Sequence, residues 1–184
     1  LAHTAQGYAG SGNVGLSDLV LALRWVRDNI GAFGGDRASV TLFGQSGGGA
    51  KIASLLACAP AQGLFHRVMT MSGQQITVQG PRAAAARARA VFAALDIPHG
   101  DVASLLATPT VRLVEATRAA DPSIAGSSIY FGPVLDEVWL ARHPFFPDAP
   151  PSGAHMPMII GNTRDETRGL SGKSDPSLFA LTWD

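Results

Sequence analysis

The chain has 184 residues, of which 46% are hydrophobic, so it is long enough to bury one sizeable core and too short for two full domains. Its formal net charge is zero, and no long run of one charge occurs, which argues against a nucleic-acid surface or a polybasic membrane anchor. No apolar run approaches the roughly 20 residues that a membrane-spanning helix needs. A signal peptide is not evident either, but the chain begins at Leu1 rather than Met, so this says little about its compartment.

The first part of the chain predicts a loop, a helix and a strand. Residues 1–15 are small, polar and glycine-rich, as in a loop. Apolar residues then recur at helical spacing, which predicts an amphipathic helix over about 17–30 that begins at an N-cap, Ser17 or Asp18, and stops at Gly31. Residues 39–45 are rich in β-branched and aromatic residues without polar alternation, which is typical of a parallel strand buried on both faces.

Helices and strands alternate through the rest of the chain. The segment between about 121 and 153 is rich in proline and predicted to be irregular, and the end, from residue 177, resembles a helix. The remaining expected elements are a helix over 47–58, a strand over 67–71, a helix over 81–96 with Pro81 at its start, two short helices within 101–107 and 110–120, and a strand over 157–161.

This order predicts an α/β fold with a parallel sheet. Three strands are too few for a complete sheet of this class, and their outer edges would be bare and apolar. We therefore interpret residues 1–184 as a single partial domain, the middle of a larger one.

Two glycine motifs could be mistaken for nucleotide sites. Residues 10–15 (GSGNVG) fit GxGxxG and have Asp36 at a suitable distance, but no strand leads into them. Residues 44–51 (GQSGGGAK) resemble a phosphate-binding loop, but Ala50 interrupts the required Gly-Lys pair and Ile52 offers no hydroxyl for magnesium. We disfavour nucleotide binding at both.

The more informative motif is GxSxG at residues 44–48 (GQSGG). The bare pattern is weak, and a strand-to-helix turn with an incidental serine would look the same. Its context is what a nucleophile elbow requires, because an apolar strand precedes it and a helix follows. Glycines let such a strained turn close and leave the Ser46 hydroxyl exposed, while the Gly47 N–H at a helix N-terminus could face an oxyanion.

The longer stretch 33–48 (FGGDRASVTLFGQSGG) resembles, residue for residue, the pattern of type-B carboxylesterases. The similarity is strong over about 13–73 and moderate over 131–168, where FGPVLDEVWLARHPF and PMIIGNTRDE lie. The resemblance implies the carboxylesterase/cholinesterase branch of the α/β-hydrolase fold. It also implies hydrolysis of small-molecule carboxylic esters through an acyl-enzyme, with no metal or organic cofactor.

Position by position, the resemblance makes Ser46 the nucleophile and Gly47 an oxyanion donor. It makes Glu166 the acid that orients a histidine, with Asp165 as the alternative. Either carboxylate could instead be a helix N-terminal charge or part of a surface ion pair. Ser72 matches a serine that supports the hydrogen bonding of the triad, although an ordinary strand-end hydroxyl would look the same.

The histidine of the triad is the main departure. In this fold the chain order is Ser, acid, His, and no histidine follows Glu166. The family's upstream HGGG-type oxyanion loop also has no counterpart in residues 1–32. We expect both parts to lie outside this sequence, and we expect each of the five histidines present to be a surface or packing residue: His3, His66, His99, His143 and His155.

The partial domain is thus expected to hold a nucleophile elbow at 40–50, a helical insertion at about 81–120 and an acid-bearing strand and loop at 157–168. Two alternatives stay open, a non-catalytic cholinesterase-like binding module and an inactive fragment. Cys58, the one cysteine, cannot form an intramolecular disulfide and is predicted to be a buried structural thiol. The lack of disulfide-forming cysteines leans toward a cytoplasmic location.

Overall fold

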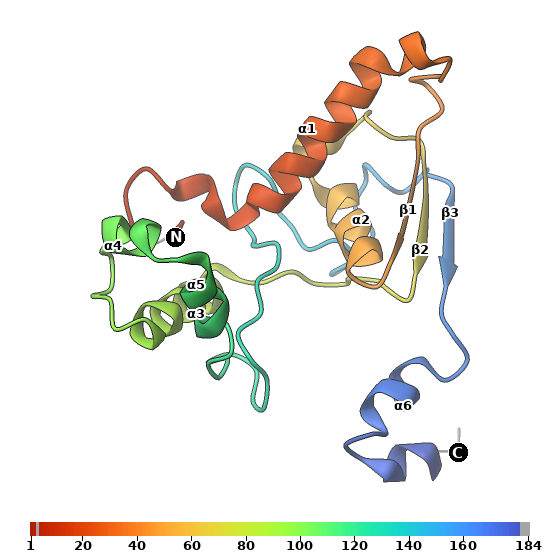
Figure 1. Cartoon of the computed structure of the whole chain (residues 1–184). Helices are drawn as coiled ribbons and strands as arrows, with labels where there is room; N and C mark the ends of the chain where they lie inside the picture. Colours follow the sequence, from red (N-terminus) through yellow and green to blue (C-terminus); the bar gives the residue numbers. More distant parts are fainter. Residues whose placement is uncertain (3, 181–184) are drawn as a thin grey trace.

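A computed structural model describes residues 1–2 and 4–180 (Figure 1). Three parallel strands form one sheet in the order β1-β2-β3, as the sequence predicts. In β1 (Thr41–Gln45) and β2 (Arg67–Met71) the residues pair one to one, and β3 (Met158–Gly161) pairs along the other side of β2. The three carboxyl ends therefore lie at the same edge of the sheet.

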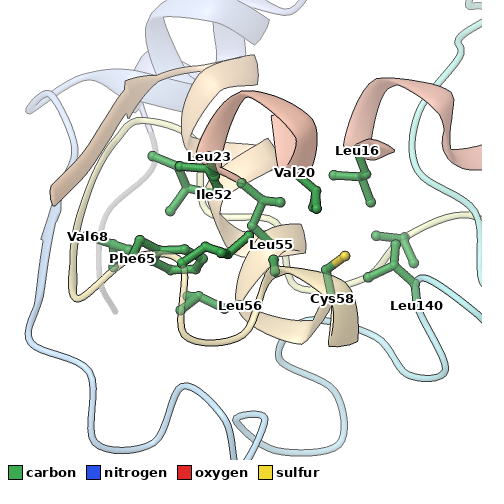
Figure 2. Close-up of a cluster of buried hydrophobic side chains, with 13 residues drawn as sticks. Leu16, Val20, Leu23, Ile52, Leu55, Leu56, Cys58, Phe65, Val68 and Leu140 are labelled. Carbon is green, nitrogen blue, oxygen red and sulfur yellow. The ribbon is translucent and has the colours of Figure 1, made fainter. Parts of the chain in front are cut away.

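Two helices cover one side of this sheet and build the core. Helix α1 (Val14–Asn29) and helix α2 (Gly47–Ala57) lie beside the strands in Figure 1, and α2 packs against both β1 and β2. Their apolar stripes meet side chains from the β2 region in a single cluster (Figure 2). Its labelled members are Leu16, Val20, Leu23, Ile52, Leu55, Leu56, Cys58, Phe65, Val68 and Leu140.

Cys58 lies inside this cluster, as predicted for a structural thiol. Its exposed fraction is 0%, and burial raises the pKa of its thiol to about 11. At neutral pH the sulfur is therefore a protonated, apolar packing group.

The ends of α1 differ from the prediction. The helix begins at Val14, directly after the 3₁₀ turn η1 (Ala9–Asn13), so the expected N-cap at Ser17 or Asp18 is wrong. The 3₁₀ turn already carries the chain into helical geometry, which removes the need for a cap three residues later. At the other end α1 continues into η2 (Ile30–Phe33) and stops at Gly34, whose φ of 79° is left-handed, rather than at Gly31.

Three short helices lie together away from the sheet (Figure 1). They are α3 (Pro81–Ala94), α4 (Val102–Ala107) and α5 (Thr110–Ala116), close to the predicted ranges and with Pro81 at the first helical position. Residues 121–157, all of which the structure describes, contain no helix or strand, as expected. Across the ranges described, no helix is long and apolar enough to cross a membrane.

The chain ends with α6 (Glu166–Ser171) and the 3₁₀ turn η4 (Pro176–Ala180). The predicted terminal helix is thus a 3₁₀ turn as far as Ala180, and its last four residues lie outside the described ones.

The outer strands are exposed to a degree that the sequence did not predict. We expected residues 39–45 to be buried on both faces, but alternate residues of β1 are exposed, and Phe43 is 75% exposed. Ile159 and Ile160 of β3 are also mostly exposed. The expected burial on both faces is wrong within these residues, because α1 and α2 cover only one side of the sheet. The exposed apolar edges of the outer strands, which we also predicted, are present.

Candidate active site

Ser46 occupies a sharp turn between β1 and α2. Its φ of 51° and ψ of −119° are strained for a residue with a Cβ, and its side chain is exposed. The backbone is held from both sides, because Ser46 N donates to Met71 O at 2.8 Å and Ser46 O accepts from Ala50 N at 3.0 Å. Strand pairing and the first turn of the helix together maintain the strain.

Two glycines make room for this turn. A Cβ on Gly44 would lie 2.5 Å from the carbonyl carbon of Gly48, and a Cβ on Gly73 would collide with Ser46 O. A Cβ on Gly48, by contrast, would meet nothing within 4 Å. The steric reason for a glycine therefore holds for the first position of GxSxG and for Gly73, but not for Gly48.

Ser72 and Glu166 meet at the same edge of the sheet. Ser72 follows β2 directly, has a φ of 51°, and its N–H donates to Gly161 O at 2.8 Å. Its hydroxyl lies 2.7 Å from Glu166 Oε2, although 94 residues separate the two in the chain. The Glu166 carboxylate is thus held at the carboxyl end of β2, the strand that pairs with β1.

Thr163 holds the same oxygen of Glu166. Its N–H donates to Oε2 at 3.0 Å and its hydroxyl donates at 2.7 Å. Together with the bond from Ser72, these hydrogen bonds lower the pKa of Glu166, the Thr163 hydroxyl contributing most, so the group is ionised at neutral pH. All three bonds go to Oε2, and Oε1 receives none in the described part of the chain.

Asp165, the alternative acid, receives no such bonds. It is the residue before α6, it is exposed, and the Ser72 hydroxyl points to Glu166 instead. Glu166 lies in the first turn of α6, as the helix-terminus interpretation expected, but within the described residues it forms no ion pair with an arginine.

Gly47 is the first residue of α2. Its N–H has no acceptor within the helix, because the first N–H groups of any helix lack one, and the helix dipole favours negative charge there. Gly47 also lines a cavity of about 420 Å³. Ser46 itself is not among the residues that line this cavity.

Two of the histidines have structural roles. His66 Nδ1 accepts a hydrogen bond from Val40 N at 3.2 Å at the start of β2, the opposite edge of the sheet from Ser46. His143 Nδ1 accepts one from Val78 N, also at 3.2 Å.

The remaining histidines bring no base to the site. His99 packs edge-on against Phe92, with ring centroids 5.5 Å apart, and His155 is exposed. His3 lies outside the described residues. Within the described part of the chain no histidine is hydrogen-bonded to Ser46 or Glu166.

The glycine-rich stretch 10–15, predicted as a loop, is instead part of the 3₁₀ turn η1 and the first residues of α1, and it has a structural role that the sequence did not predict. The Asn13 side chain donates to Val134 O at 2.8 Å and to Asp136 Oδ2 at 2.7 Å, and its oxygen accepts from Val134 N at 3.0 Å. A Cβ on Gly12 would already touch Val134 at 3.4 Å. Through these hydrogen bonds η1 connects the start of α1 to a segment more than 120 residues away in the sequence.

Thr163 and Gly73 are the site residues that sequence reasoning missed. Thr163 had a signal, because a threonine three residues before a glutamate is the capping-box spacing, at which the glutamate carboxylate accepts from the threonine N–H, as it does here. Gly73 had none, since its need for a missing Cβ arises from the close approach of the Ser46 and Gly49 backbones, which lie more than 20 residues away in the sequence.

The model of the carboxylesterase family matches residues 3–178. The chain is 40% identical over 163 residues to a para-nitrobenzyl esterase of Bacillus subtilis, and 37% identical over 160 residues to a phenmedipham hydrolase of Pseudarthrobacter oxydans. These alignments cover 86% and 85% of this chain but only 32% of each relative. The chain therefore spans about a third of the length of these relatives.

Solved structures give the same result. A carboxylesterase of Geobacillus stearothermophilus matches 97% of this chain with a TM-score of 0.77 and 36% identity, and 37% of that protein is covered. An esterase of Clostridium hathewayi matches 94% of this chain with a TM-score of 0.74 and 31% identity, and 38% of it is covered. The fold is that of the α/β-hydrolase esterases, and the chain belongs to the carboxylesterase family.

Proposed function

We propose that the complete protein is a serine carboxylesterase in which Ser46 is the nucleophile and Glu166 is the acid of the triad. The observation that carries this proposal is the hydrogen bond between Ser72 and Glu166 at the edge of the sheet where Ser46 is exposed. It holds an ionised carboxylate at the end of β2, next to the end of β1 that carries the strained serine. That arrangement is the one a Ser-His-acid triad requires.

The chemistry follows from these positions. The Ser46 oxygen attacks the ester carbonyl carbon and gives its proton to a histidine, while the Gly47 N–H donates to the oxygen that becomes negative. The alcohol leaves with that proton, and the acyl group stays on Ser46. Water then attacks the acyl-enzyme and gives a proton to the histidine, which passes it to the Ser46 oxygen as the bond to the acyl group breaks and the carboxylic acid is released. Glu166 stays ionised throughout and stabilises the protonated histidine.

The histidine and the main oxyanion loop come, in this proposal, from segments outside the 184 residues. His66 and His143 are committed to backbone groups elsewhere, and the chain spans only about a third of its relatives. Glu166 Oε1, which receives no hydrogen bond within the described residues, is available to accept one from an imidazole. The substrates are small carboxylic esters, the class that the names of the esterase relatives indicate.

Ester hydrolysis by the purified 184-residue chain tests whether the catalytic histidine lies outside it. We expect the 184-residue chain to hydrolyse 4-nitrophenyl butyrate no faster than background, and the complete protein to hydrolyse it in a way that Ser46→Ala abolishes. Turnover by the 184-residue chain that disappears in Ser46→Ala would overturn the proposal that the base lies elsewhere. A complete protein that binds esters without hydrolysing them would instead be a cholinesterase-like binding module.

A further inference from the structure

The loop that carries Glu166 begins at a point that the sheet holds in place. Gly161, the last residue of β3, accepts a hydrogen bond at its carbonyl oxygen from the N–H of Ser72 at 2.8 Å. The side chain of Gln74 donates to the same oxygen at 3.4 Å. Thr163, only two residues further along the chain, therefore lies at a defined place beside the carboxyl ends of β2 and β3.

Thr163 contacts the Glu166 carboxylate with two donors, its N–H at 3.0 Å and its hydroxyl at 2.7 Å. Both meet the same oxygen, Oε2, whereas Ser72 contributes a single bond to it. Two donors from one residue fix the direction of the carboxylate as well as its distance. Threonine is also β-branched, so its χ1 is restricted and it presents the hydroxyl in few orientations.

A glutamate needs such support more than an aspartate does. Its side chain has one more rotatable bond, and the last torsion, which turns the carboxylate, is broad and roughly two-fold. A carboxylate that orients a histidine has to offer one oxygen in a constant position. Among the three hydrogen bonds to Glu166, the one from the Thr163 hydroxyl also lowers the pKa of the carboxyl group most.

We propose that Thr163 is a positioning residue of the ester hydrolysis, which holds Oε2 of Glu166 against the loop so that Oε1 faces the histidine. This inference rests on the proposed function, because the orientation of the carboxylate matters to the reaction only if Glu166 is the acid of the triad. Thr163 acts through the acid and does not touch the substrate. Acylation and deacylation use the same histidine, so both steps slow together when its acid is displaced.

The test is the variant Thr163→Val in the complete protein. Valine keeps the size, the β-branching and the backbone N–H, and it removes only the hydroxyl. We expect kcat for 4-nitrophenyl butyrate to fall roughly 10-fold, as the loss of one hydrogen bond to a charged group allows, and KM to stay within about twofold. Thr163→Ser, which restores the donor, should recover most of kcat.

Thr117→Val is the matched control. The hydroxyl of Thr117 also donates one hydrogen bond of 2.7 Å, but its acceptor is the carbonyl oxygen of Val114 in α5. The same chemical change at this place should leave kcat unchanged. A comparable loss in Thr117→Val would show that the effect does not depend on Glu166 and would overturn the inference.

A second substitution, Glu166→Gln, shows whether Thr163 acts through the acid. Once the carboxylate is gone, adding Thr163→Val should lower kcat by less than about twofold, because there is no acid left to position. A further 10-fold loss in the double variant would mean that Thr163 acts independently of Glu166. A urea midpoint of Thr163→Val that falls together with kcat would likewise give Thr163 a structural role instead.

The same variants separate this inference from the proposed function. Full activity in Thr163→Val, together with a large loss in Glu166→Gln, overturns the inference and leaves the proposed function intact. Full activity in Glu166→Gln removes the acid role itself, and with it the proposed function, whatever Thr163→Val does.

Discussion

The turn at Ser46 and the loop at Glu166 lie at the same edge of the sheet but are held in place in different ways. The turn at Ser46 is maintained by backbone contacts, since its strand pairing, its helix and the glycines beside it leave little freedom. The loop at Glu166 is maintained by side chains, through three hydrogen bonds to one carboxylate oxygen. Backbone support tolerates few substitutions, whereas side-chain support can be removed one bond at a time.

If the proposed function holds, changes at these two places should have different consequences in the complete protein. A substitution at the Ser46 turn changes the backbone conformation, so we expect it to lower the free energy of unfolding. A substitution at the Glu166 loop leaves the backbone unchanged and alters charge, so we expect it to change activity and its pH dependence. The predictions below separate the two in the complete protein.

The largest effect is expected for Glu166→Gln. The amide keeps the size of the side chain but cannot stabilise a protonated histidine, so kcat/KM should fall roughly 10³- to 10⁴-fold. Unfolding in urea should change little. Asp165→Asn is the matched control, and a comparable loss of activity in that variant would transfer the acid role to Asp165.

A large loss of stability is expected for Gly44→Ala, because its Cβ would lie within 2.5 Å of the Gly48 backbone. Overpacking against a backbone that cannot move should lower the free energy of unfolding by roughly 3 kcal/mol or more. Gly48→Ala is the control within the same motif, since its Cβ meets nothing, and it should stabilise α2 by up to about 1 kcal/mol. Similar urea midpoints for the two variants would show that the turn is not held by its backbone.

A smaller effect is expected for Ser72→Ala. The variant removes one of three hydrogen bonds to Glu166 and leaves both bonds from Thr163, so kcat/KM should fall by roughly 10-fold. Ser72→Thr, which restores the hydroxyl, should recover part of the activity. Full activity in Ser72→Ala would show that Ser72 does not support the acid and is an ordinary residue at the end of a strand.

The smallest effect is expected in the acid dependence of stability. Hydrogen bonds lower the pKa of folded Glu166, so its contribution is fully present above the unfolded-state value of about 4.3 and is lost as the pH falls through the lowered pKa. The difference in urea midpoint between wild type and Glu166→Gln should therefore shrink from pH 7 to pH 3. A difference that stays constant over this range would mean that the carboxylate is not held as an ion.

Local features of the sequence were enough to predict the sheet, the helices and the turn at Ser46. The strand at 67–71 and the proline at the start of α3 are encoded within a few residues, and the structure confirms them. The start of α1 was predicted wrongly because residues 9–13 form a 3₁₀ turn that leads into the helix, and the bonds from Asn13 to Val134 and Asp136 that hold this turn are not revealed by any local pattern. Gly73 was missed for the same reason, since the backbone atoms that a Cβ on it would meet are distant in the chain.

The central claim, that Ser46 is the nucleophile and that its base lies outside these 184 residues, has one direct test. A fluorophosphonate probe should phosphonylate the complete protein at Ser46, identified by mass spectrometry of the modified peptide, and should leave the isolated 184-residue chain unmodified. Attachment to any other residue of the complete protein, or labelling of the isolated chain at the same rate, would contradict the account.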